Sequence, residues 1–272
     1  VPGLIHYRMQ YHPILDWGDQ DLHQILKLMG PRLLNIGVIQ INFVVMFNLA
    51  SFLGEGSVSA LDYGWDLMQM PQTIIGSALG IVLFPTMAVL AAQGDIAALR
   101  RTMAQALRII LALSIPAMVG LIVLGRSIIQ LMFERGEFGP DSTAAVYQSL
   151  QFWAIALIAH SALEVVNRVF YAQKDTVTPL LSSLVSMVIN IGLALALYQT
   201  LQAGGLALSN GIAVTVEVLI MLVIAHRRMA GVEAGSTLNT LARTLLAAGA
   251  MGATVIAFTA LLPSLPPLLL AV

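Results

Sequence analysis

The chain has 272 residues and a formal net charge of −1, with 58% hydrophobic and only 10% charged residues. Its mean hydropathy of +0.86 is typical of a membrane protein and excludes an average soluble domain. The lack of a long basic run argues against a nucleic-acid partner. The lack of cysteine excludes disulfides, thiolate metal sites and a cysteine nucleophile.

The first residues, VPGLIHYRMQ, have neither an initiator methionine nor the basic and apolar regions of a signal peptide. We therefore expect the chain to be part of a longer protein. Residues 1–32 would hold the end of a preceding helix and a cytoplasmic amphipathic linker. In this linker Leu22, Ile25, Leu26 and Met29 have helical spacing, which predicts a helix lying on the inner membrane surface.

A helix needs about 20 mostly apolar residues to cross the hydrocarbon core. Charges and turn residues divide residues 33–262 into about seven such pieces, which predicts an all-α polytopic membrane protein. The polar QAGG at 202–205 would fold an uncharged run, too long for one crossing, into a helical hairpin. Residues 263–272, rich in proline, would form a loop toward a further helix. The predicted crossings are about 33–54, 65–92, 104–125, 144–171, 177–199, 205–226 and 240–262.

The basic residues predict an orientation, because Lys and Arg gather on cytoplasmic loops. With these crossings, Arg126 and Arg135 are the two exceptions among the 13 Lys and Arg. We therefore expect the N-terminal segment to be cytoplasmic. The residues on that side are Arg8, Lys27, Arg32, Arg100, Arg101, Arg108, Arg168, Lys174, Arg227, Arg228 and Arg243.

Prolines and glycines punctuate the predicted helices. Pro71, Pro85 and Pro116 each remove a backbone hydrogen bond, which predicts kinks. Gly76 and Gly80 have the G-x-x-x-G spacing that allows two membrane helices to approach closely.

The most charged stretch, LMFERGEFGPDST at 131–143, lies between two predicted crossings on the outer side. Its apolar residues can enter the membrane interface while the charges stay in water, and Gly136 can form the turn. Asp141 or Ser142 would cap the next helix. This pattern predicts an interfacial hairpin, and not an active site.

Ionisable residues inside the predicted crossings are costly and therefore candidates for function. Glu217 could be a protonatable or cation-binding carboxylate, or a protonated side chain hydrogen-bonded to a neighbouring helix. Glu164 and Arg168 share a helix face at i, i+4, which favours a structural ion pair over a substrate contact. Asp66 could face a central cavity or the headgroup region.

Amides form a second polar group. We expect Asn190 and Asn210 to face each other across the predicted hairpin and to hydrogen-bond between helices, as would Asn35, Gln40, Asn42 and Asn48. The five histidines lack metal-binding spacing. No nucleophile elbow or phosphate-binding loop occurs. We therefore predict a protein of recognition and gating, with no catalytic residue, metal or cofactor.

Four stretches together resemble the MurJ (MviN) family of lipid II flippases, in the multidrug/oligosaccharidyl-lipid/polysaccharide exporter superfamily. They are LKLMGPRLL at 26–34, residues 50–88, LMFERGEF at 131–138 and RVFYAQKDTVTP at 168–179. The last two resemble the patterns L-F-x-R-G-x-F and F-Y-A-x-x-D-T-x-T-P of the family. The residues that match them are Arg135, Gly136, Phe138, Tyr171, Asp175, Thr178 and Pro179.

The resemblance implies most of the C-terminal lobe of a fourteen-helix flippase in the bacterial cytoplasmic (inner) membrane. Such a protein moves undecaprenyl-pyrophosphate-linked peptidoglycan precursor from the inner to the outer leaflet by alternating access, for cell-wall synthesis. Its partners would be this lipid, the membrane lipids and an N-terminal lobe of the same chain. The coupling cation would be sodium or a proton, and some members bind sodium near the positions of Asn190 and Asn210.

The chain departs from the family at three candidate cavity positions. Well-studied members carry an Arg and, three residues later, a Glu where this chain has Asp66 and Gln69. Many members have a Lys at the position of Glu164. These departures leave two alternatives open: an exporter of another polyprenyl-linked glycan, and a non-transporting membrane scaffold of the cell-wall machinery.

Overall fold

The computed structural model describes residues 20–231 and 233–261, and their regular structure is all helical. Residues 1–19, which hold the expected end of a preceding helix and much of the linker, lie outside the described residues, as does the expected loop at 262–272. The elements are α2 (Gln20–Ser51), α3 (Ser57–Gln72), the π-helix η1 (Thr73–Ser77), α4 (Ala78–Ala92), α5 (Ile96–Phe133), α6 (Pro140–Ala172), α7 (Val177–Arg228) and α8 (Ala234–Leu261).

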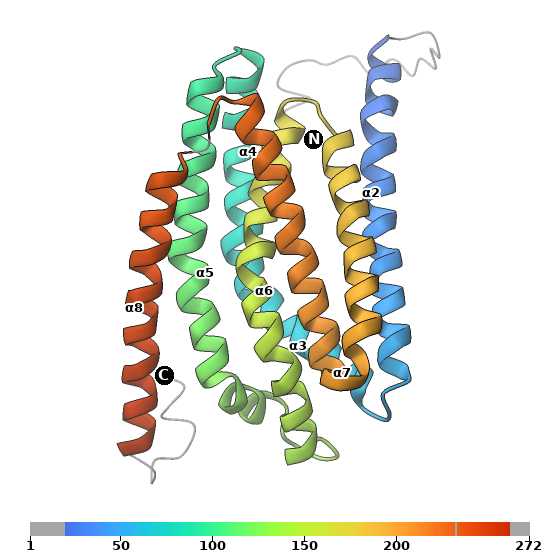
Figure 1. Cartoon of the computed structure of the whole chain (residues 1–272), viewed down its shortest axis with the longest axis vertical. Coiled ribbons are helices and arrows are strands. Elements are labelled where there is room, and N and C mark those ends of the chain that lie inside the picture. The colour runs from blue at the N-terminus through green and yellow to red at the C-terminus, as the bar shows by residue number, and fades with distance from the viewer. Residues whose placement is uncertain (1–19, 232, 262–272) are drawn as a thin grey trace, which may run out of the picture.

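The helices run up and down along one bundle axis (Figure 1). The connections after α4, α6 and α7 lie at the end where α2 begins, which we name the inner end after the predicted orientation. The connections after α2 and α5 lie at the opposite, outer end. Six described segments, one of them running from Ser57 to Ala92, are long and apolar enough to cross a membrane. The prediction of an all-α polytopic membrane protein is confirmed.

The first crossing starts earlier than the sequence predicted. The described part of the linker is no separate surface helix, because α2 continues from Gln20 through Pro31 to Ser51. A proline removes one hydrogen bond but does not end a helix whose neighbouring turns stay paired. Residues 20–32 therefore extend the first crossing toward the inner end.

The helix α7 is a hairpin of two arms that make two crossings. Within its 52 residues, Gln202 has φ 51 and ψ −136, where the chain reverses, and Figure 1 shows the two arms meeting there. A side chain at Gly205 could not fit, because a Cβ would lie 2.5 Å from the carbonyl oxygen of Leu197. The predicted turn at QAGG is confirmed, and the six long segments make the seven expected crossings.

The π-helix η1 joins α3 and α4 into one long rod immediately after Pro71. Proline lacks the N–H that the α-helical pattern requires, and a π turn is one way in which a helix absorbs such a defect. The helices α4 and α5 continue through Pro85 and Pro116.

The central helix is α6, which α3, η1, α4, α5 and α7 approach through glycines. A Cβ at any of these glycines would lie within 3.0 Å of an atom of α6, so each helix packs directly against it. The buried side chains Trp153 and Phe170 anchor two core clusters on α6, one toward each end of the bundle. The glycines are Gly64, Gly76, Gly80, Gly125, Gly204 and Gly211.

The loop at 134–139 forms the expected turn, with Gly136 at φ 61. The expected cap at Asp141 or Ser142 is wrong, because α6 already begins at Pro140 and Gly139 occupies the cap position without a side-chain hydrogen bond. Proline favours the first helical position, since its φ is already helical.

Candidate functional site

A polar hollow of about 420 Å³ lies between α2, α4 and α6 in the inner half of the bundle. We name it the inner hollow. Its apolar walls come from α2 and α4, and its polar groups from α2 and α6. The polar residues that line it are Arg32, Asn35, Glu164, Asn167, Arg168 and Tyr171.

Glu164 and Arg168 form the ion pair that their spacing predicted. Nη1 of Arg168 contacts the Glu164 carboxylate and also donates to the Glu164 carbonyl oxygen at 2.7 Å. The two side chains keep 33% and 20% of their surface exposed, so the pair faces the hollow and is not sealed in the core. The pair therefore holds the Arg168 guanidinium in one orientation at the wall.

A second arginine lines the hollow from α2. The guanidinium carbon of Arg32 lies 5.5 Å from the ring centroid of Tyr171, within the range of a cation–π contact. Two arginines and one carboxylate leave the hollow with a net positive charge. Guanidinium groups donate in a fork that fits phosphate oxygens, so the hollow suits an anionic group.

Two amides of the hollow have unused acceptors. The Oδ1 atoms of Asn35 and Asn167 are buried and have no hydrogen-bond partner among the described residues. Buried polar atoms are nearly always paired, so these two oxygens are exceptions in the wall of the hollow.

Glu217 is buried, with 6% of its surface exposed. It lies on the second arm of α7, and its carboxyl group hydrogen-bonds to Ser186 on the first arm. The three ion pairs of the described residues do not include it. An unpaired buried charge is costly, so this environment favours the neutral acid.

The predicted contact across the α7 hairpin is an amide network around Met46. Asn190 donates to Oδ1 of Asn42 at 2.7 Å and approaches the Met46 sulfur at 3.2 Å, while Asn210 lies 3.8 Å from that sulfur. Oδ1 of Asn210 accepts a hydrogen bond from Nε2 of His160 at 3.0 Å. Interhelical hydrogen bonding is thus confirmed for these amides.

The amide network does not fit a sodium ion. Hard cations take several oxygen ligands, preferably with carboxylates among them. Here the Oδ1 atoms of Asn42 and Asn210 already accept hydrogen bonds, and the Met46 atom that contacts the amides is a thioether sulfur. Among the three amides of this network in the described residues, the Oδ1 atom without a partner is that of Asn190.

Asp66 and Gln69 lie elsewhere, on α3, and line neither the inner hollow nor the outer pocket described below. With Asp62 they form an exposed stripe at helical spacing. Carboxylates of a membrane-crossing helix do not face hydrocarbon. This stripe therefore marks a side of the bundle that meets water or protein.

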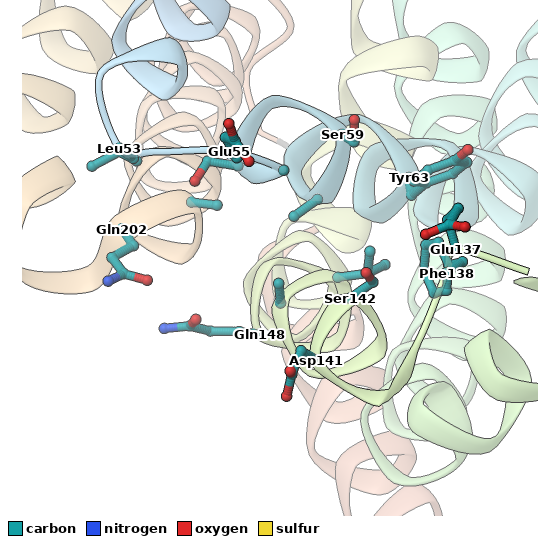
Figure 2. Close-up of a pocket in the computed structure, with 16 residues that line it drawn as sticks. Leu53, Glu55, Ser59, Tyr63, Glu137, Phe138, Asp141, Ser142, Gln148 and Gln202 are labelled. Atoms are coloured by element: carbon teal, nitrogen blue, oxygen red, sulfur yellow. The ribbon is translucent and has the colours of Figure 1, made fainter. Parts of the chain in front are cut away.

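A second polar pocket, of about 600 Å³, opens at the outer end (Figure 2). Glu55 comes from the loop before α3, Glu137 from the loop before α6, and Asp141 from the first turn of α6. Gln202, at the α7 turn, lies on one side of it, and Tyr63 on the other. Its lining holds three carboxylates and no basic residue, so it is electrostatically opposite to the inner hollow.

The signature residue Asp175 closes the inner end of α7. Its Oδ1 accepts from the backbone N–H groups of Val177 at 3.0 Å and Thr178 at 2.9 Å, and its Oδ2 accepts from the Thr178 hydroxyl at 2.6 Å. Arg228, the last residue of the second arm, pairs with Oδ2 at 2.6 Å. Burial raises the pKa of Asp175, but the hydrogen bonds from Thr178 and Arg228 outweigh burial and hold that pKa below its ordinary value of 3.8.

The other signature residues have structural surroundings. Phe138 packs edge-on against Tyr63, with ring centroids 5.9 Å apart. Pro179 is buried in the first turn of α7 and Arg135 is exposed in the loop before α6. The signature therefore stabilises connections at both ends of the bundle.

Sequence reasoning missed several partners in these sites. It treated Arg32 and Arg228 only as indicators of orientation, and His160 only as a residue without metal spacing. The tyrosine in the signature could have suggested a cation–π partner for an arginine, but no local pattern identifies which one.

The fold is that of solved membrane transporters. It matches "Lipid II flippase MurJ, inward closed conformation" with a TM-score of 0.73 and 24% identity, over 92% of this chain and 51% of that chain. A transporter of the MOP superfamily from Pyrococcus furiosus matches with a TM-score of 0.68 and 15% identity, over 85% of this chain and 53% of that chain. The fold class is therefore that of one half of a MOP superfamily transporter.

The sequence comparisons define the family. A family model described as "Lipid II flippase MurJ" matches residues 1–265. A "Probable lipid II flippase MurJ" from Rickettsia prowazekii is 33% identical over 77% of this chain and 40% of its own length. One from Haemophilus influenzae is 31% identical over 94% of this chain and 51% of its own length. The chain belongs to the MurJ family, and it spans about half the length of these relatives, or less.

Proposed function

We propose that this chain is one lobe of a lipid II flippase in the bacterial cytoplasmic membrane. The full-length protein would move undecaprenyl-pyrophosphate-linked peptidoglycan precursor from the inner to the outer leaflet, with the inner end of the bundle facing the cytoplasm. Family membership supports this substrate. It supports a transporter and not an enzyme.

The proposal rests on the net positive inner hollow within a bundle of apolar, membrane-crossing helices. A sugar–peptide pyrophosphate cannot cross hydrocarbon without a polar path. Arg32 and Arg168 offer donors for phosphate oxygens. A second lobe, the partner expected from the resemblance, would supply the facing wall.

The exposed stripe of Asp62, Asp66 and Gln69 would face the same central cavity toward the outer side. Its carboxylates would repel a pyrophosphate that has moved outward from the arginines. The arginines would attract the pyrophosphate at the inner side, and the carboxylates would repel it further out. This arrangement favours release after translocation, because the headgroup must bind strongly enough to enter and weakly enough to leave.

The coupling ion in this proposal is a proton carried by Glu217. The carboxyl group lies between the two arms of α7, so a change in its charge would alter how these arms pack. The amide network lacks a donor set for sodium, which leaves the proton as the better candidate.

A second candidate is export of another polyprenyl-linked glycan. The charge departures at Asp66, Gln69 and Glu164 favour it, since a different headgroup would select different cavity charges. A solved relative of the fold is described with the words "Reverse polarity of binding pocket suggests different function". In this chain the Glu164 carboxylate pairs with Arg168 and orients it, so the acidic residue at position 164 does not itself argue against a pyrophosphate ligand.

Complementation tests the proposal. The full-length protein is produced in a bacterium depleted of its own lipid II flippase, and lipid II in the outer leaflet is measured by its accessibility to an external enzyme. We expect restored growth and restored outer-leaflet lipid II. A well-expressed protein that restores neither would contradict the proposal and leave the other-glycan exporter and the scaffold as the explanations.

A further inference from the structure

The rod of η1 and α4 approaches α6 closely at two glycines one turn apart, Gly76 on η1 and Gly80 on α4, and the two contacts differ. A Cβ at Gly76 would lie 2.8 Å from the backbone Cα of Ser161 and 3.2 Å from its carbonyl oxygen. Backbone atoms in the middle of a packed helix cannot move aside. Gly76 therefore serves the packing of the two helices.

At Gly80 the contact is with a side chain. A Cβ there would lie 2.7 Å from Nε of Arg168 and 2.8 Å from its Cδ and Cζ. The guanidinium group thus occupies the space that a side chain at residue 80 would fill. A methyl group here would leave the helices in place and displace the end of a flexible arginine.

The same guanidinium group is held by Glu164 through Nη1. Nη2 has no partner among the described residues, and Arg168 lines the inner hollow. The contact of Nη1 with Glu164 and the close approach of Nε to Gly80 therefore fix the plane of the guanidinium group, and Nη2 stays available. A planar fork binds phosphate well only when its plane is set in advance.

We propose that Gly80 is a positioning residue for headgroup recognition: its missing side chain lets Arg168 lie flat against α4 and present its free nitrogen to a phosphate group in the inner hollow. The inference rests on the proposed function, because it takes the ligand to be a polyprenyl pyrophosphate. Gly80 acts only through Arg168.

A double-mutant cycle tests this dependence. The purified full-length protein and its G80A, R168A and G80A/R168A variants are titrated with farnesyl pyrophosphate, a soluble polyprenyl pyrophosphate, and with farnesol as the uncharged control. The matched glycine control is G120A on α5, where a Cβ would meet nothing within 4 Å. Thermal unfolding of each variant reports on packing separately from binding.

We expect G80A to weaken farnesyl pyrophosphate binding about tenfold, the loss expected for one charge-assisted hydrogen bond. Its Tm and its farnesol binding should match those of the unmodified protein. In the R168A background, G80A should have no further effect. G76A should lower the Tm, because its methyl group meets backbone.

Three results would overturn the inference. If G80A leaves pyrophosphate binding unchanged, or weakens it by the same factor with and without Arg168, then Gly80 does not act through the arginine. If R168A itself binds farnesyl pyrophosphate as well as the unmodified protein, the inner hollow is not the headgroup site. That last result contradicts the assignment of the hollow in the proposed function, and the first two leave it standing.

Discussion

Replacing Asp175 by alanine should destabilise the protein mainly by uncapping α7. Asp175 accepts hydrogen bonds from two backbone N–H groups at the first turn of α7, and losing such a cap costs about 1 kcal/mol. The hydroxyl bond from Thr178 adds about 1 kcal/mol. The pair with Arg228, whose side chain is 44% exposed, adds no more than about 0.5 kcal/mol after solvent screening.

The expected loss for D175A is therefore about 2 kcal/mol, or a Tm decrease of roughly 2–4 °C in a full-length protein about twice the size of this chain. Thermal unfolding of the purified full-length protein in detergent measures it. D175N is the matched control, since asparagine keeps the cap and loses only the charge, and R228A removes the pair alone. Both should cost less than half as much as D175A. If R228A lowers the Tm as much as D175A does, the ion pair and not the cap stabilises the start of α7, which would contradict this prediction.

The pH dependence follows from the lowered pKa of Asp175. Since the folded protein holds that pKa below 3.8, the stabilisation by the charged carboxylate is complete above pH 3.8 and is lost as the pH falls through the folded value. The Tm difference between the unmodified protein and D175A should be constant near neutral pH and shrink in acid below pH 3.8. A difference that grows in acid would contradict the sign.

Three further predictions concern Glu217, Asp66 and Gly64. E217Q should abolish flipping in the complementation assay while expression stays normal; unchanged activity would return Glu217 to a structural hydrogen bond. The chain has no cysteine, so a single cysteine can be introduced into a cysteine-free full-length protein. D66C should react with a membrane-impermeant maleimide, whereas the control L195C, at an exposed apolar position, should not. Equal labelling of the two variants would place Asp66 outside a water-filled cavity. G64A should lower the Tm by several degrees more than G120A, because the added methyl group would overlap a side chain of α6 at Gly64 and meets open space at Gly120.

Local patterns predicted the crossings and the turns, because apolar length and glycine act within one segment. The hairpin at QAGG and the pair of Glu164 with Arg168 are both short-range in sequence, and both are confirmed. The first crossing was placed too late, because Pro31 and the polar residues before it were taken as a boundary. A proline inside a helix disturbs one turn only, so the sequence alone could not show that α2 continues through it.

Contacts between distant residues could not be predicted in the same way. Arg32 meets Tyr171 across the inner hollow, and His160 meets Asn210 where α6 packs against α7. The rotation of each helix about its axis decides these pairs, and that rotation depends on close packing at glycines of several helices. The same holds for Asp66 and Gln69. The resemblance made them candidates for the cavity, and the packing of the helices places them apart from the inner hollow.

If the inner hollow binds the pyrophosphate headgroup during flipping, the loss of Arg168 should slow translocation. The most direct measurement is the rate at which the full-length protein and R168A, reconstituted in vesicles, move fluorescent lipid II between leaflets. We expect rapid flipping by the unmodified protein and a rate at least about tenfold lower for R168A, with equal reconstitution of both. Equal rates for the two proteins, or no flipping by the unmodified protein, would contradict it.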